Sequence, residues 1–133
     1  MEIQVMPNGK MGLVNLPVYF DFKDKNELIE VIPKWIKGYG LTLIVFNFTT
    51  TEFIGSSGVY PFFQFLAGSE LKHGRKKVRI AIIGLCDPYQ SLMDGMGIRK
   101  HFLLYKNGMN FAQEAQRKLD VSPTEAQTLL EWM

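Results

Sequence analysis

The stretch that decides the fold is LTLIVFNFTTTEFIGSSGV, residues 41–59. Residues 41–48 are almost continuously apolar, which is typical of a strand covered on both faces and therefore of a central parallel strand. Residues 78–84, VRIAIIG, form a second run of the same kind. Because a helical stretch from 57 to about 71 separates the two runs, the sequence predicts a right-handed strand–helix–strand crossover.

The N-terminal segment predicts a hairpin followed by a helix. An Asn-Gly pair at 8–9 between two short apolar runs is typical of a tight antiparallel turn. Apolar residues then recur at helical spacing over 24–37, and the glycines at 38–40 are expected to end that helix. Pro33 is expected to bend or interrupt its last turn.

The C-terminal half predicts three helices and an edge strand. Asp87 is expected to cap a short helix that ends at 95–97, and residues 101–105, HFLLY, are a candidate edge strand. Asn107 or Asn110 is expected to cap a helix that reaches 119. Ser122 and Glu125 form a capping box that opens a last helix to 133. The order of elements predicts an α/β domain with a mixed sheet of four or five strands.

Composition narrows the class of protein. The chain has 133 residues, which is one domain by length, and 15 Lys and Arg against 13 Asp and Glu give a net charge of +2. That balance is unlike a dedicated nucleic-acid binder, so direct nucleic-acid binding is not expected. The sequence shows neither a secretory signal pattern at its start nor an apolar run long enough to span a bilayer. Its single cysteine, Cys86, fits a reducing compartment, and a cytoplasmic location is expected.

The turn Gly55-Ser56-Ser57-Gly58 is the predicted functional centre. It follows the central strand and opens the next helix, so it displays hydroxyls at the carboxyl edge of a parallel sheet, where α/β domains place their sites. The first N–H groups of that helix carry partial positive charge. A serine there can cap the helix, or can carry a phosphate whose charge the helix dipole favours.

The segment LIVFNFTTTEFIGSSGV and the order of elements resemble a STAS domain, the fold of bacterial anti-sigma factor antagonists. The resemblance covers roughly residues 1–119 and includes a Gly84-Leu85 strand end, Met96-Gly97-Ile98 and the ending FLLYKNGMNFAQEAQ. It implies a STAS-like mixed sheet with helices packed against it, and leaves 120–133 as an extra C-terminal helical extension. It also implies a regulator that binds an anti-sigma factor or a serine-protein kinase, and that exchanges partners when a serine is phosphorylated.

By position in the family pattern, Ser56 is the phosphorylatable residue and Ser57 caps the helix. Two positions depart from the pattern: Gly55 replaces the acidic residue before the serine, and Asn47 replaces the acidic residue at the end of the central strand. The surface expected to bind the partner comprises Asn47, Thr49, Thr51, Gly55, Ser56, Ser57, Gly58, Val59, Cys86, Asp87 and Met93.

Other functions remain open at this stage. The two departures favour a constitutive scaffold or a transporter-complex subunit, and the helix start at 56–58 fits a small-anion or nucleotide sensor. An enzyme is not expected, because no base, nucleophile and oxyanion set can be assembled and no HExxH, CxxC or P-loop pattern is present. The sequence therefore predicts neither a cofactor nor a metal, and Cys86 is interpreted as a small apolar residue.

Three further features have two interpretations each. The basic run 72–77, KHGRKK, is interpreted as a solvated loop rather than an anion or nucleic-acid patch. Phe62, Phe63 and Phe65 are too dense for one helical stripe, so some are expected to be exposed or to face a partner. The last helix, with apolar residues at 129, 130, 132 and 133, is expected to dock on its own domain, on a second copy in a homodimer, or on a partner.

Overall fold

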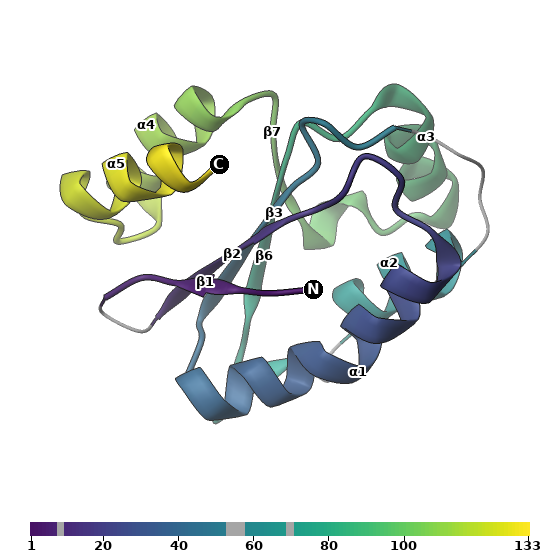
Figure 1. Cartoon of the computed structure of the whole chain (residues 1–133), viewed down its shortest axis with the longest axis horizontal. Helices are drawn as coiled ribbons and strands as arrows, with labels where there is room; N and C mark the ends of the chain where they lie inside the picture. Colours follow the sequence, from purple (N-terminus) through teal and green to yellow (C-terminus); the bar gives the residue numbers. More distant parts are fainter. Residues whose placement is uncertain (8–9, 53–57, 69–70) are drawn as a thin grey trace.

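A mixed sheet forms the centre of the molecule (Figure 1). The structure, a computed structural model, describes residues 1–7, 10–52, 58–68 and 71–133. Its five-stranded sheet has the order β1-β2-β3-β6-β7, and β1 is antiparallel to β2 while the other neighbours are parallel. The strands are β1 (Gln4–Val5), β2 (Met11–Asn15), β3 (Leu43–Asn47), β6 (Arg79–Ile83) and β7 (Leu103–Tyr105). The predicted hairpin, crossover and edge strand are confirmed, although residues 8–9 of the hairpin turn lie outside the described ranges.

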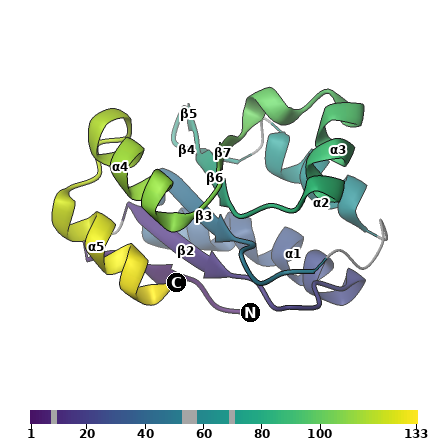
Figure 2. The same cartoon turned by 90° about the horizontal axis from the view of Figure 1, so that it is seen from above.

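Helices cover both faces of the sheet (Figure 2). One face carries α1 (Phe22–Tyr39), α2 (Val59–Ala67) and α3 (Asp87–Met96), and the other carries α4 (Gly108–Lys118) and α5 (Pro123–Trp132). A short hairpin of β4 (Lys72–His73) and β5 (Lys76–Lys77) precedes β6, and the 3-10 helix η1 (Arg99–His101) precedes β7. The basic run 72–77, interpreted from the sequence as a solvated loop, therefore forms a two-stranded antiparallel ribbon.

Alternation along β3 explains why its sequence is apolar throughout. Ile44 and Phe46 belong to the core beneath α1, α2 and α3, whereas Leu43 and Val45 belong to the core beneath α4 and α5. Successive side chains of a strand point to opposite faces, so a strand with helices on both faces needs apolar residues at every position. The sequence-based prediction of a doubly covered strand is confirmed.

Pro33 does not interrupt the first helix, which was one of the two effects predicted for it. This residue lies inside α1, which continues to Tyr39 and ends at Gly40, where φ is 70°. Pro33 is exposed, so the ring lies on the solvent side while Ile32 and Ile36 remain buried in the core. Losing one internal hydrogen bond on the wet side of an 18-residue helix is tolerable when its apolar side is packed.

Of the phenylalanines of α2, some of which were expected to be exposed or to face a partner, only Phe65 is partly exposed. Phe62 and Phe63 are fully buried, and Phe65 packs against the same core. The reason is that α2 packs on α1 as well as on the sheet, while Phe63 also meets Tyr89 of α3 edge-on at 5.9 Å. A helix with neighbours on two sides buries more than one stripe. It is also shorter than predicted, because it ends at Ala67.

The other helix ends mostly follow the sequence signals. Asn107 caps α4 through the N–H of Asn110, and Ser122 caps α5 through the N–H of Glu125. The predicted cap Asp87 is instead the first residue of α3, whose N-cap is Cys86. The last helix docks on its own domain, since Ala126 and Leu129 are buried in the core beneath α4 and α5.

Candidate functional site

The carboxyl ends of β2, β3, β6 and β7 meet at one edge of the sheet, because these four strands are parallel. This edge is where α/β domains place their sites, and the predicted functional turn leaves it from β3. Gly55, Ser56 and Ser57 lie outside the described residues. The two ends of the turn are defined: Glu52 pairs with Tyr19 in an isolated parallel bridge, and Gly58 is the N-cap of α2 with φ of 73°. The N-cap position predicted for Ser57 is thus held by Gly58.

Asn47 organises the polar groups at this edge. Its Nδ2 donates to Oδ1 of Asn15 at 2.8 Å, and its Oδ1 accepts from the backbone N–H of Thr49 at 3.0 Å and from the Thr49 hydroxyl at 2.5 Å. Asn15 in turn donates to the Trp132 carbonyl at 2.9 Å. An amide both donates and accepts, so Asn47, through Asn15, links the end of α5 to the start of the loop that follows β3.

The loops after β2 and β3 are fastened together. The Thr51 hydroxyl donates to the Pro17 carbonyl at 2.9 Å, and the N–H of Glu52 donates to the Val18 carbonyl at 2.8 Å. A β-carbon built at Gly84, where φ is 72°, would lie 2.8 Å from Cα of Thr49, so only glycine fits there. The residues that follow β3, from Thr49 to Glu52, are therefore fixed by contacts with neighbouring loops.

The structure separates the predicted binding residues into two groups. Thr49 and Asp87 are exposed, and Asn47, Gly58 and Cys86 are partly buried at the edge. Thr51, Val59 and Met93 are buried, so their side chains face the interior and not the surface where a partner would bind. Val59 and Met93 lie on the core sides of α2 and α3, and Thr51 is used inside the molecule.

Exposed apolar side chains surround the two ends of the turn. They form what we term the apolar rim: Val18, Tyr19, Phe22 and Tyr60, exposed by 42%, 64%, 54% and 44%. These residues flank the same turn: Tyr19 pairs with Glu52 before it, and a β-carbon at Gly58, two residues before Tyr60, would lie 2.7 Å from Phe22. Sequence reasoning missed these residues, and the only local signal was an apolar Val18-Tyr19 pair inside a connecting loop.

A buried lysine lies behind the rim. The Lys25 ammonium donates to the Phe20 carbonyl at 2.8 Å and stands 5.1 Å from the centre of the Phe20 ring. Burial lowers the pKa of Lys25 below its usual range, while the carboxylates of Asp21 and Asp24 act in the opposite direction. Lys25 also approaches Gly58, whose added β-carbon would lie 3.3 Å from its Cδ. The lysine thus ties the loop after β2 to the start of α2.

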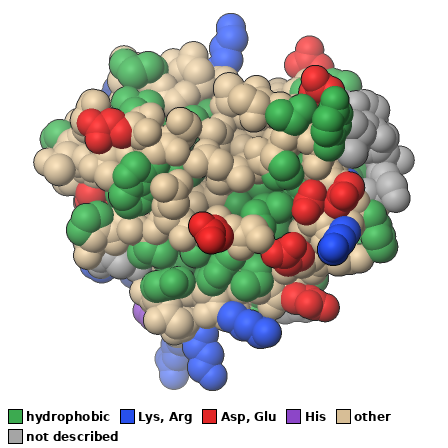
Figure 3. Space-filling model, in the orientation of Figure 1, with side chains coloured by type: hydrophobic (Ala, Val, Ile, Leu, Met, Phe, Trp, Pro, Cys, Tyr) green, Lys and Arg blue, Asp and Glu red, His purple; other side chains and the backbone are tan. Residues whose placement is uncertain are grey.

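The rim is flanked by acidic residues. Asp21 and Glu52 are exposed, and Asp24 is half-buried beside them. Figure 3 shows acidic side chains gathered on the side of the molecule where α1 begins. Within the described ranges, no three His, Cys, Asp or Glu side chains come together as a metal site would need. None of the helices in the part of the chain that the structure describes has the length and apolar character of a membrane span.

The elements and their order define a STAS-like α/β fold. The anti-sigma factor antagonist SpoIIAA, in its unphosphorylated form, is similar in structure: the TM-score is 0.57 at 15% sequence identity, over 88% of this chain and 97% of that one. A candidate anti-sigma factor antagonist from Thermotoga maritima aligns with a TM-score of 0.48 at 11% identity, over 86% of this chain and 93% of that one. No protein-family model and no curated protein matches the sequence. The STAS fold expected from the sequence is confirmed.

Proposed function

We propose that this chain is a STAS-type regulatory domain that binds a signalling protein at the carboxyl edge of its sheet. The observation that carries the proposal is the apolar rim beside the predicted turn, on a fold shared with an anti-sigma factor antagonist. Its partner would be an anti-sigma factor or a serine-protein kinase, met in the cytoplasm. The domain would act as an anti-sigma factor antagonist rather than as an enzyme.

The chemistry of the rim supports a protein partner. Contiguous exposed aromatic side chains are typical of interfaces, where they act as anchors that become desolvated on binding. Tyr19, Phe22 and Tyr60 supply such anchors, and Asp21 and Glu52 supply negative charge at their margin. The complementary surface of the partner should therefore carry an apolar pocket edged by Lys or Arg.

The rim gives a direct test of partner binding. We expect the double substitution Tyr19→Ala and Phe22→Ala to weaken the complex by at least about tenfold, because each removes an anchor of the kind that contributes over ~1 kcal/mol. The measurement is titration calorimetry with anti-sigma factors and serine kinases encoded in the same genome. Tyr39→Ala is the control, since Tyr39 is 53% exposed at the far end of α1. The proposal fails if none of these proteins binds, or if the control weakens binding equally.

The switch is a separate part of the proposal and concerns Ser56. Incubation with ATP and the kinase that binds the domain is expected to add one phosphate, seen by intact mass spectrometry. Ser56→Ala should abolish the addition, and Ser57→Ala should retain it. The phosphate, about −1.5 to −2 in charge, would add to the acidic margin of the rim and release a partner whose surface depends on apolar contact.

One observation favours a second candidate, a constitutive scaffold without a switch. Asn47 stands where the family pattern has an acidic residue, and its amide bonds to Asn15 and Thr49. An amide cannot act as the carboxylate that the pattern places at this position. Binding of a partner with no mass shift at Ser56 would select the scaffold.

A further inference from the structure

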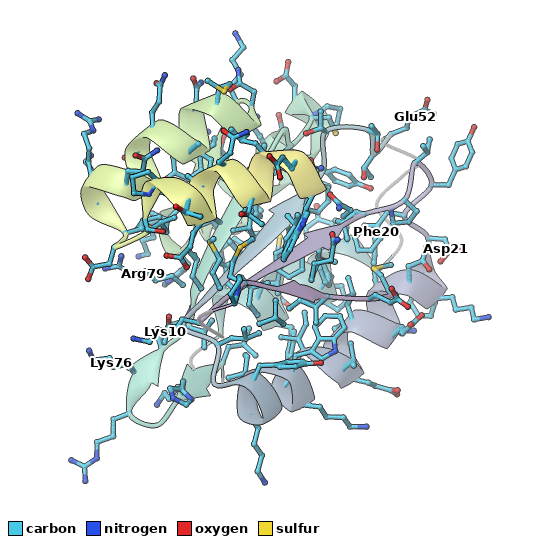
Figure 4. The ribbon with its side chains drawn as sticks, turned by 60° about the vertical axis from the view of Figure 1, so that its left-hand side comes forward. Lys10, Phe20, Asp21, Glu52, Lys76 and Arg79 are labelled. Carbon is cyan, nitrogen blue, oxygen red and sulfur yellow. The ribbon has the colours of Figure 1, made fainter. Side chains whose placement is uncertain are left out.

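A basic groove lies at the opposite edge of the sheet from the apolar rim. It is lined by Lys10, Lys76, Lys77, Arg79 and Lys118, together with His73, Thr42 and Asp120, and it encloses about 410 Å³. Figure 4 shows Lys10, Lys76 and Arg79 together, on the side of the molecule away from Asp21 and Glu52. The groove uses residues that the proposed partner-binding surface does not.

The topology brings these cations together from distant parts of the sequence. Lys10 precedes β2, Thr42 precedes β3 and Arg79 begins β6, and the starts of parallel neighbours meet at one edge. Their backbones are bonded to one another: the Lys10 carbonyl accepts from the N–H of Thr42 at 2.8 Å, and the Thr42 carbonyl accepts from the N–H of Arg79 at 2.9 Å. The base of the groove is therefore rigid, although its lysine side chains are long.

The positive charge of the groove is poorly balanced within the chain. Among the described residues, Lys76, Lys77 and Arg79 form no ion pair with a carboxylate, whereas Lys118 pairs with Glu114 at 3.1 Å. Lys72 stands directly opposite Lys77 in the β4–β5 ribbon, an arrangement of like charges that costs stability. Burial lowers the pKa of Lys77, although most of its side chain remains exposed. A bound anion would offset the repulsion between these cations.

The shape of the groove favours a compact anion. It is concave, and among the described residues no Phe, Tyr or Trp lines it, so it lacks the large stacking platforms typical of single-stranded nucleic-acid sites. The Arg79 guanidinium can bind a phosphate through two parallel N–H donors, and the lysines add flexible point charges around it. Because several cations line one small groove, it suits a ligand with closely spaced phosphate groups better than a ligand with a single phosphate.

We propose that this groove binds a ligand with two or more adjacent phosphate groups, either as a free molecule or as the headgroup of a lipid. The site is independent of the partner-binding surface, because it lies at the amino edge of the sheet and shares no residue with the rim. Binding of the ligand and of a protein partner can therefore occur together.

The test is titration calorimetry of the full chain with inorganic tripolyphosphate and with inositol trisphosphate, at low and at physiological salt. We expect binding that weakens as salt rises. Lys76→Gln combined with Arg79→Gln should reduce the affinity at least about tenfold, because hydrogen bonds to charged groups are lost. Asp120→Asn should raise the affinity several-fold, since it removes the carboxylate that lines the groove, and its φ of 57° suits asparagine.

Matched controls decide the outcome. Lys23→Gln combined with Lys34→Gln removes the same charge from the exposed side of α1, away from the groove, and should leave the affinity unchanged. Flotation with vesicles containing phosphatidylinositol bisphosphate separates the two sources of the ligand. Binding of the protein to these vesicles identifies a lipid headgroup as the ligand. Binding to tripolyphosphate but not to the vesicles identifies a free molecule. The proposal is overturned if neither phosphate binds, if both double variants weaken binding equally, or if an oligonucleotide binds and the compact phosphates do not.

Discussion

Replacing Phe62 with alanine is expected to lower the free energy of unfolding by about 3–5 kcal/mol. Phe62 is fully buried and its ring lies 5.2 Å from that of Phe20, 6.2 Å from Phe46 and 5.8 Å from Phe63. Alanine removes these ring contacts and leaves a cavity where α1, α2 and the sheet meet. Urea unfolding followed by circular dichroism measures the loss, as a shift of the midpoint at unchanged slope.

The matched control is Tyr60→Ala on the same helix. Tyr60 is 44% exposed, and its removal is expected to change stability by no more than about 0.5 kcal/mol. Equal losses in the two variants would contradict the packing described for α2. Because Phe20 belongs to the loop that carries Val18 and Tyr19, Phe62→Ala should also weaken partner binding, whereas Tyr60→Ala acts on binding alone.

The behaviour of α2 shows where local patterns stop being informative. The run 41–48 predicted a buried central strand correctly, because a strand covered on both faces has apolar residues at nearly every position of its own sequence. Which phenylalanines of α2 are buried could not be predicted, because their burial depends on α1 and α3, which the sequence of α2 does not reveal. Local periodicity reports how many faces are apolar, not how many neighbours cover them.

Both surfaces proposed for binding could be predicted only in part from the sequence, for a related reason. Phe22 and Gly58 are far apart along the chain, and they meet only because α1 packs beside α2. Likewise, the run 72–77 looked like an isolated basic loop, and Lys10, Arg79 and Lys118 join it only through the sheet. Function at such sites arises from non-local pairing, which composition and spacing do not encode.

The departure from the family pattern at position 47 has a physical basis in this chain. Asn15 gives its amide hydrogens to the Trp132 carbonyl and to Gln4, so its Oδ1 must accept a hydrogen bond from its neighbour. Asn47 can supply that donor, whereas an ionised carboxylate cannot. The extra helix α5 and the amide at position 47 thus form one polar unit that ends at Thr49.

Replacing Leu129 with alanine is expected to lower the free energy of unfolding by about 2–5 kcal/mol. Leu129 is fully buried and anchors α5 in the core that it shares with Phe111 and Ala115 of α4. A helix of 10 residues is too short to be stable alone, so its order depends on this packing. Urea unfolding measures the loss, and NMR should show shifted amide signals at Asn15 and Thr49, because α5 bonds to Asn15.

Gln127→Ala is the control for this substitution. Gln127 is exposed on the same helix, and alanine is an equally good helix former, so stability should change by no more than about 0.5 kcal/mol. A loss under about 1 kcal/mol for Leu129→Ala would mean that residues 120–133 are a separable extension of a domain that ends near 119. A loss in the expected range would make α5 part of the folding unit. The end of the chain would then be one of the groups that hold the start of the loop that follows β3.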